Sequence, residues 1–477
     1  MNKKIPTIDF GSILLITNII IIISTYIAYF FSNDYQYINW ITIFLSTILG
    51  LQTIAILFYE KGRRNPFVII VAYIVTAFYS FRIFTLTIFE WSNVFSRYSY
   101  SVDDTNYALV YIIIANIFLY GGLIYQKKLP FNSGAIEKKP ESHALYYIVL
   151  LSILTLFDYT KKYYWNEVNI PSGLNFLLII LSSKVLIILS IAYLLKYKNY
   201  IRKIYIYLVI ILILLETVLN TISGSRSAIL VVFNDLLITL LALHNCVQIR
   251  RKIFIRFLCI SPIIIALLFG SFGVATFIRE NNNGANSLEL SQAIQTISNI
   301  NTLSMGNDLL AKTFDRVGYF DYSAEIIANR EHYIEIFNLE FYAKSIVDNI
   351  LTPGFDFFDQ PRVENALMFI YGNLGTPSKI ATYENYHSDQ LGIYGEFHNL
   401  FGFFSFPILF VVALVFRRLF LGITGSKFSD LLKKIFILHI FFITFNSFGI
   451  DWVLTEAIVL LLAFYIYERI GRSFRYG

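Results

Sequence analysis

FGSILLITNIIIIISTYIAYFF, residues 10–31, is an uncharged and almost wholly apolar run. A helix rises about 1.5 Å per residue, so about 20 such residues cross the hydrocarbon core of a bilayer. Runs of this kind recur along the 477-residue chain, of which 56% is hydrophobic and only 15% is charged. The run follows Lys3 and Lys4 as in a signal peptide, but it is too long and lacks a small-residue cleavage site, so we expect a retained span. The sequence therefore predicts an all-α polytopic membrane protein.

Twelve apolar runs are candidate spans. They lie near residues 10–31, 37–59, 67–89, 107–125, 144–159, 174–195, 204–222, 227–243, 253–277, 391–416, 431–449 and 452–470. Most of the 38 basic residues fall in alternate loops between them, as at Lys61–Arg64 and Lys196–Lys203. The positive-inside rule then places these loops and both termini in the cytoplasm. The net charge of +6 is accounted for by this topology, so we expect no nucleic-acid partner.

A polar stretch of about 110 residues interrupts the pattern after the ninth run. It divides the chain into a membrane bundle at residues 1–278, an extracytoplasmic loop domain at 279–390, and three last spans at 391–477. Apolar residues at helical spacing in 287–303 and 319–328 predict short helices there. We expect chemistry on a water-soluble group in this stretch or at the helix ends beside it.

Arg226 is the first candidate site residue, because it begins a predicted span directly after Ser223, Gly224 and Ser225. A guanidinium beside the free N–H groups of a helix start is a suitable seat for a phosphate or pyrophosphate. The alternative is an arginine that reaches the headgroups or pairs with Glu216. Lys184, with Glu216 or Asp235, is a candidate for a structural ion pair inside the bundle.

The outer stretch supplies further candidates. Several arginines and one lysine there have a carboxylate close by, and these positions are Arg279 with Glu280, Arg316 with Asp315, Arg330, Arg362 and Lys379. A guanidinium binds phosphate oxygens in pairs and stabilises the charge of a departing pyrophosphate. His387, His398 and Glu396 flank the point where the chain re-enters the membrane, and any of them would accept a proton from a sugar hydroxyl. The alternatives are solvated salt bridges for the cations and capping or surface roles for the histidines.

Other kinds of chemistry lack their sequence signals. The chain has no glycine-rich loop ending in Lys-Ser/Thr, no His-Glu-x-x-His, no Cys-x-x-Cys and no Gly-x-Ser-x-Gly. Its two cysteines predict neither a disulfide framework nor a metal site. We therefore expect neither a metal nor a cofactor.

Two short motifs occur at residues 223–230, SGSRSAIL, and at residues 392–404, where the chain re-enters the membrane. The first resembles the Ser-Gly-Ser-Arg-Gly/Ser motif of the O-antigen and capsule repeat-unit polymerases, the Wzy family. Residues 392–404, GIYGEFHNLFGFF, resemble its Gly-Glu-x-x-x-x-Phe-Gly-x-x-Gly motif from Gly395 as far as Gly402, and the last glycine of the motif is not matched. The order of parts is similar as well, because the large outer loop follows the first motif two spans later.

The resemblance implies a metal-independent glycosyltransferase of GT-C-like fold in the bacterial plasma (inner) membrane. Such an enzyme moves a growing glycan from undecaprenyl pyrophosphate to the non-reducing end of a new lipid-linked repeat unit on the outer face. Its partners would be the lipid-linked oligosaccharides, the bilayer, a chain-length regulator and a flippase. We expect Arg226, Arg279, Arg316 and Arg362 to bind pyrophosphate, and Arg226 with Glu396, His398 or His387 to form the catalytic site.

Two other functions stay open at this point. A lipid-linked oligosaccharide flippase or transporter of similar span count fits the apolar runs equally well. Its class usually has short outer loops and two similar halves, and neither feature is visible in this chain. An O-antigen ligase shares the chemistry and differs in the acceptor, and its His-Asn pair is similar to His398-Asn399.

Overall fold

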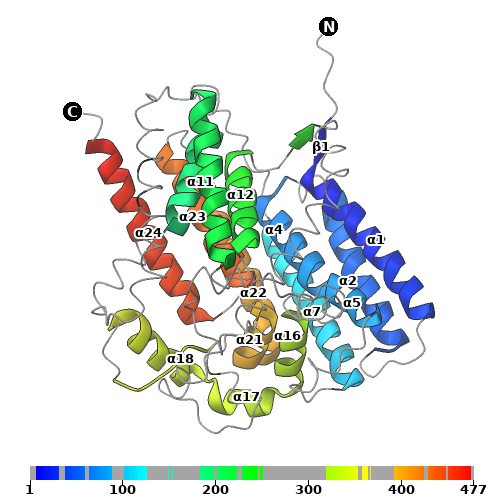
Figure 1. Ribbon diagram of the computed structural model, residues 1–477. Helices are drawn as coiled ribbons and strands as arrows, with labels where there is room; N and C mark the ends of the chain where they lie inside the picture. The colour runs from blue at the N-terminus through cyan, green and yellow to red at the C-terminus, as the bar shows by residue number, and fades with distance from the viewer. Residues whose placement is uncertain are drawn as a thin grey trace, which may run out of the picture.

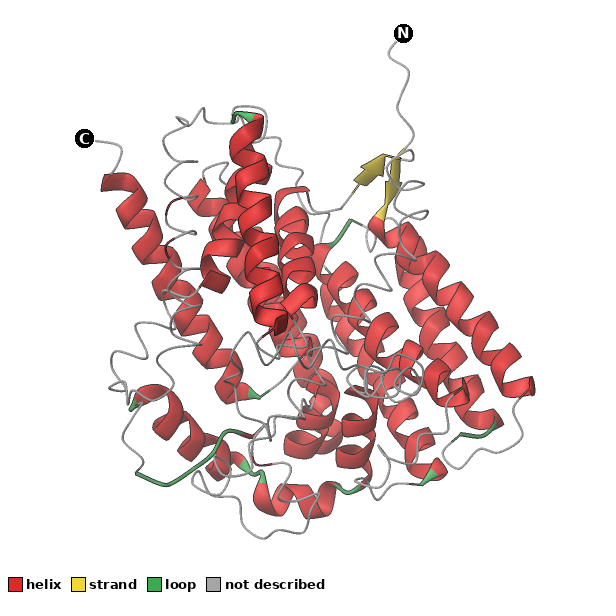
Figure 2. Ribbon diagram, in the orientation of Figure 1, coloured by secondary structure: helices red, strands yellow, loops and turns green. Residues whose placement is uncertain are grey.

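The computed structural model describes the greater part of the chain. The described residues are 7–31, 38–59, 64–88, 101–125, 149, 153, 183–197, 201–222, 228–244, 248–250, 319–352, 357–363, 366, 392–423, 428–446 and 449–473. They are almost entirely helical, apart from the short antiparallel pair of β1 (Thr7–Asp9) and β2 (Gln248–Arg250) (Figures 1 and 2). The predicted α-helical membrane class is confirmed at this level, whereas the GT-C-like arrangement and the count of twelve spans stay predictions.

The first four long elements are α1 (Phe10–Phe31), α2 (Trp40–Phe58), the continuous α4–η1–α5 rod (Pro66–Ile74, Val75–Ser80 and Phe81–Ile88) and α7 (Val102–Ile124). Their starts are set by polar caps. Asn39 and Ser101 each form a capping box, with Thr42 and Asp104 respectively. The cap at Ser101 explains why α7 begins five residues before the predicted limit, because apolar periodicity does not register a polar first turn.

Five helical segments of the described chain are long and apolar enough to cross a membrane: Phe10–Phe31, Trp40–Phe58, Pro66–Ile88, Val102–Ile124 and Gly392–Leu421. In α1 only 22% of the apolar window is buried inside the protein. Its outer face carries isoleucines such as Ile20 and Ile23, each more than half exposed. Such a face is suited to lipid rather than to water.

Later helices coincide with other predicted spans. These are α10 (Ser183–Tyr197), α11 (Lys203–Ile222), α12 (Ala228–His244), α23 (Phe428–Asn446) and α24 (Ile450–Ser473). The predicted spans 144–159 and 253–277 lie almost wholly outside the described residues, as do the domain limits at 278 and 390. The start of α1 and the end of α24 lie at the same end of the bundle (Figure 1).

The described part of the predicted outer domain contains α16 (Tyr319–Ala328), α17 (Arg330–Ile336), α18 (Leu339–Ile346) and the π-helical turn η2 (Val347–Leu351). Helix α16 packs against α7 and α21 (Gly392–Phe401), so it belongs to the bundle rather than to a layer on its surface. A buried ion pair fixes it there: Arg82 of α5 places Nε 2.8 Å and Nη2 2.6 Å from Asp321 Oδ2, and neither side chain is exposed. A second, smaller core around Tyr333, Phe337 and Phe341 joins α17 and α18.

The chain returns through α21, the 3-10 turn η3 (Gly402–Phe404) and α22 (Ser405–Leu421), which packs along α7. The two backbones approach closely at Gly122, where an added Cβ would lie 2.5 Å from the carbonyl oxygen of Phe410. Only glycine fits there. This close pairing of α7 with α22 brings the start of α7 to the end of α21, and the candidate site lies at that junction.

Candidate functional site

A cavity of about 540 Å³ opens at the end of the bundle where α7 begins and α21 ends. Tyr107 of α7, Arg330 and His332 of α17, His398 of α21 and Phe403 of η3 line it. These side chains combine a cation, two imidazoles and two aromatic rings in one hollow. The cavity therefore joins the groups expected for binding an anion and accepting a proton.

His398 forms one wall of the cavity and is only 3% exposed. Aromatic rings surround its imidazole, with centroids at 4.6 Å for Tyr111, 6.1 Å for Phe403 and 6.2 Å for Tyr107. Its Nδ1 atom is buried and has no hydrogen-bond partner among the described residues. Buried polar atoms nearly always have a partner in folded proteins, so an unpartnered nitrogen on a residue of the cavity wall marks His398 as a candidate functional group.

Arg330 is held at the cavity by the end of α21. Its Nε donates to the carbonyl oxygens of His398 at 2.9 Å and Asn399 at 3.1 Å, which belong to the last turn of α21. The two terminal nitrogens form no hydrogen bond within the described part of the chain. The guanidinium is thus fixed by one edge, while its other edge keeps donors for an anion.

The three glycines of the re-entry segment 392–404 have structural tasks. Gly392 and Gly402 have φ angles of +64° and +54°, which other residues adopt at a cost. Gly395 lets α21 approach α16, because an added Cβ would lie 3.2 Å from Cα of Ser323. The motif that carries the family resemblance is therefore used here for tight packing and for the turn that positions Arg330.

Glu396 does not line the cavity. It lies two residues before His398, which is about 200° around a helix, and it faces Tyr342 and Asp451 instead. Glu396 is 1% exposed, and its carboxyl group interacts with the Tyr342 side chain and the backbone of Ile450. Burial, followed by the charge of this carboxyl group, raises the pKa of Tyr342 well above its ordinary value. The structure thus separates the two candidate proton acceptors.

Arg362 also lies away from the cavity. Its guanidinium is 5.4 Å from the ring centroid of Trp452, at the start of α24, and it interacts electrostatically with Asp451. Asp451 accepts a hydrogen bond from Ser345 Oγ at 2.8 Å. Arg362 therefore joins the outer segment to α24, and the structure does not bring it together with His398.

The remaining candidates divide into two groups. Arg226, Arg279, Glu280, Asp315, Arg316 and His387 lie outside the described residues. Glu216 is buried on α11, and Lys184 is in the first turn of α10 with a side chain that is not described. Asp235, the other suggested partner of Lys184, lies 3.6 Å from Nδ1 of His439 on α23.

Sequence reasoning identified His398 and noted Arg330, but it missed the roles of Tyr107 and His332 and the partner of Arg82. Arg82 falls within the predicted span 67–89, where a charged residue needs a partner. Nothing in the sequence pointed to Asp321, which is 239 positions away. Among the described residues, no group of three or more His, Cys, Asp or Glu side chains is arranged to hold a metal ion.

Comparison with known proteins adds no relative: no protein-family model, no curated protein and no solved structure matches this chain.

Proposed function

We propose that the chain is a membrane glycosyltransferase that polymerises lipid-linked glycan repeat units, with the cavity between α7, α17 and α21 as its acceptor site. The observation that supports this most is the pairing, in one hollow, of a buried imidazole with an unpartnered nitrogen and a fixed guanidinium. These two groups fit a transfer reaction in which a hydroxyl loses its proton and a phosphate group departs.

In this proposal the acceptor sugar lies against Tyr107 and Phe403, with its hydroxyl beside His398. The hydroxyl oxygen attacks the anomeric carbon of the donor glycan, and the bond from that carbon to the carrier pyrophosphate breaks. The bonding electrons leave with the pyrophosphate, and the hydroxyl proton passes to His398. Arg330 stabilises the phosphate charge, together with Arg226, Arg279 and Arg316 if these gather at the same site.

An aromatic seam along α7 and α22 gives a lipid-linked substrate a route to the cavity. Phe403 is followed by Phe406 at 5.9 Å, and Phe406 stacks on Phe118 at 5.6 Å. Phe403 is 62% exposed and Phe118 38% exposed at the rim of the bundle. A seam that begins at the cavity and continues over a membrane-facing helix pair suits a molecule with a polar head and a long apolar chain.

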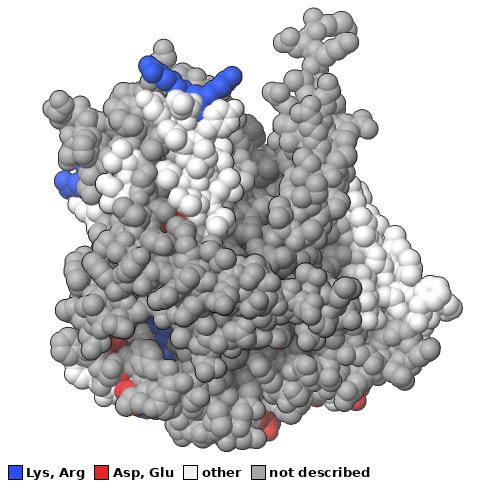
Figure 3. All heavy atoms as spheres, viewed as in Figure 1, with Lys and Arg blue, Asp and Glu red and all other residues white. Residues whose placement is uncertain are grey.

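The charge distribution supports the proposed orientation in the bacterial inner membrane. Lys and Arg side chains gather at the end where α11 begins, and Asp and Glu side chains appear toward the opposite end, where α17 lies (Figure 3). A positive cytoplasmic face would put the cavity on the outer side, where exported repeat units are found.

The deciding experiment measures glycan length in a deletion strain that carries wild-type protein, His398→Gln or Arg226→Ala at matched membrane levels. His439→Gln is the matched control, because His439 is equally buried but lies on α23, away from the cavity. We expect single-repeat glycan at the surface with His398→Gln and Arg226→Ala, and polymer with His439→Gln.

Two results would count against the proposal. Polymer of normal length with His398→Gln would show that the cavity takes no part in the reaction. Lipid-linked repeats trapped on the cytoplasmic side in the deletion strain would show a flippase instead.

A further inference from the structure

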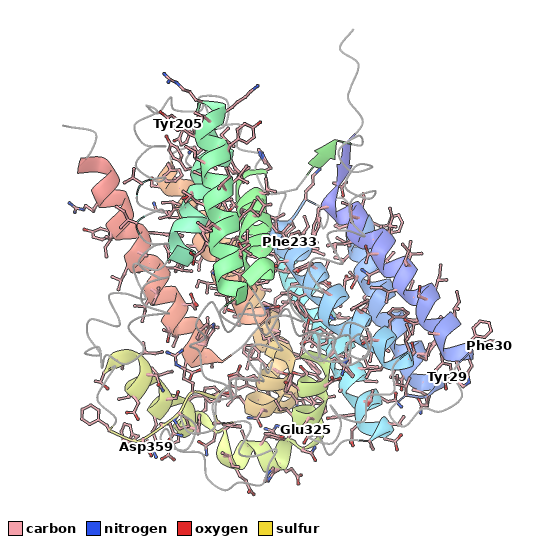
Figure 4. The ribbon with its side chains drawn as sticks, in the orientation of Figure 1. Tyr29, Phe30, Tyr205, Phe233, Glu325 and Asp359 are labelled. Atoms are coloured by element: carbon pink, nitrogen blue, oxygen red, sulfur yellow. The ribbon has the colours of Figure 1, made fainter. Side chains whose placement is uncertain are left out.

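The turn at residues 357–360 is held rigidly by two side chains of η2. The Asp348 carboxylate accepts hydrogen bonds from the backbone N–H groups of Phe357, Phe358 and Gln360, at 3.0 to 3.3 Å. Asn349 Nδ2 donates to the Gln360 carbonyl oxygen at 3.1 Å. Asp348 is fully buried, so its charge is stabilised by these N–H groups. The turn is thus part of the fold, and Figure 4 labels its Asp359 beside α18 at the edge of the protein.

This rigid turn presents apolar side chains outward. Phe357 is 66% exposed and Phe358 is 49% exposed, and the neighbouring ends of the helical stretch add Leu339 at 64% and Leu351 at 67%. We call these four residues the outer apolar edge. The Asp348 contacts fix the backbone of the turn, and both phenyl rings remain largely exposed in that fixed conformation. A fixed, exposed apolar edge indicates a partner.

The surroundings of the edge indicate which partner covers it. Helix α18 and η2 both pack against α24, and Figure 1 shows α18 beside the bundle, level with the end of α24 where Ile450 lies. Trp452, under the Arg362 guanidinium, marks that end. Tryptophan is enriched where a membrane-spanning helix meets the membrane–water boundary. The outer apolar edge therefore lies beside the start of α24, where the predicted span 452–470 would meet the membrane–water boundary.

Charge at the edge is consistent with a phospholipid surface. Lys344 Nζ lies 5.8 Å from the ring centroid of Phe358 and 2.7 Å from Glu340 Oε1, so a cation stands directly beside the apolar rings. Helices that lie in the membrane interface combine these features, with apolar side chains in the acyl boundary and lysines at the phosphates.

We propose that α18, η2 and the turn at 357–360 form an interfacial element, whose outer apolar edge inserts into the bilayer leaflet at this end of the bundle. Phe357 and Phe358 enter the acyl boundary, and Lys344 lies at the level of the lipid phosphates. The element would anchor the described outer segment to the membrane beside α24. This proposal does not depend on the reaction that the protein catalyses.

Spin labelling tests the insertion in the full-length protein. Cys246 and Cys259 are replaced by serine, and a nitroxide is attached to a single cysteine in Phe357→Cys or, as the control, in Glu335→Cys on the polar side of α17. The protein is reconstituted in vesicles of phosphatidylethanolamine and phosphatidylglycerol. Oxygen concentrates in the acyl region, whereas a neutral nickel chelate stays in water, so the ratio of their relaxation effects reports depth.

We expect this ratio to be several-fold higher at position 357 than at position 335. Equal ratios at the two positions would show that the edge lies in water and would overturn the proposal. Protection of position 357 from both reagents would mean that protein covers it, which also contradicts insertion. Adding Asp348→Ala to the Phe357→Cys protein should release the turn and lower the ratio, whereas Glu340→Gln should leave it unchanged.

Discussion

At the scale of single residues, Gly402 links the backbone of the re-entry segment to the position of Arg330. Its φ of +54° costs a residue with a side chain about 1–2 kcal/mol. An added Cβ would be 3.6 Å from Arg330 Cζ, which is an ordinary contact, so backbone strain is the whole penalty. We expect Gly402→Ala to lower the thermal midpoint in detergent and to reduce activity. Gly422→Ala is the control, because φ is −63° there and the substitution should be tolerated.

Two substitutions of Arg330 should distinguish its structural role at the end of α21 from the role of its positive charge in the cavity. In Arg330→Ala the carbonyl oxygens of His398 and Asn399 lose a charged donor, a loss of about 1.5–3 kcal/mol, and the cavity loses its cation. Arg330→Lys keeps the charge but cannot both cap these carbonyls and present a second edge to phosphate. We therefore expect lysine to restore stability more than activity, measured as thermal midpoint and as rate with purified lipid-linked repeats. Full activity in Arg330→Ala would show that this residue does not contribute to the reaction.

At the scale of elements, the sequence predicted helices well wherever an apolar run is continuous. Helices α1, α2, α11 and α12 follow their predicted limits within a few residues. The insertion of α16 into the bundle was not predicted, because Asp321 and Arg82 are 239 positions apart and no periodicity links them. The π-helical turn η1 was missed for a related reason, since its apolar sequence is as compatible with an ordinary helical turn.

The same limit applied to the candidate site. His398 was identified because it flanks the predicted re-entry point, and its separation from Glu396 follows from helix geometry alone. Nothing in the sequence predicted that the ring of Tyr107, from the second turn of a distant helix, would lie with its centroid 6.2 Å from that of His398. Contacts between elements far apart in the chain are not encoded in local pattern, so the cavity itself required the structure.

The Arg82–Asp321 pair should be the main attachment of α16 to α5. Removing one partner leaves an uncompensated charge in the core and costs about 3–5 kcal/mol. We expect Arg82→Ala and Asp321→Ala each to lower the thermal midpoint sharply, and Arg82→Met with Asp321→Leu to recover part of the loss. Lys344→Ala, which breaks the exposed pair with Glu340, is the control and should change the thermal midpoint little. A single variant as stable as this control would show that packing alone holds α16.

At the scale of the whole molecule, the direction of the bundle in the membrane ties the parts together. Basic residues lie at the start of α11, where Arg202 precedes Lys203, and near the end of α24, at Arg469. At the opposite end of the bundle, α17 begins with one residue of each charge, Arg330 and Glu331. Basic segments near span ends stay in the cytoplasm, so the cavity should open on the opposite face. This orientation is a requirement of the proposed reaction, because exported repeat units would otherwise never meet His398.

Labelling of single cysteines in intact cells checks that orientation. With the native cysteines replaced by serine, a maleimide that cannot cross the membrane should react with Glu331→Cys but not with Arg202→Cys or Arg469→Cys until the membrane is opened. The three positions belong to exposed helix or loop ends of the described chain, so reactivity depends on side rather than on burial. Labelling at positions 202 and 469 in intact cells, with position 331 protected, would show that the protein has the opposite orientation in the membrane. Labelling of only one of positions 202 and 469 would mean that an odd number of spans separates them. The predicted count of twelve spans would then be wrong, and so would the prediction that both termini lie on the cytoplasmic side.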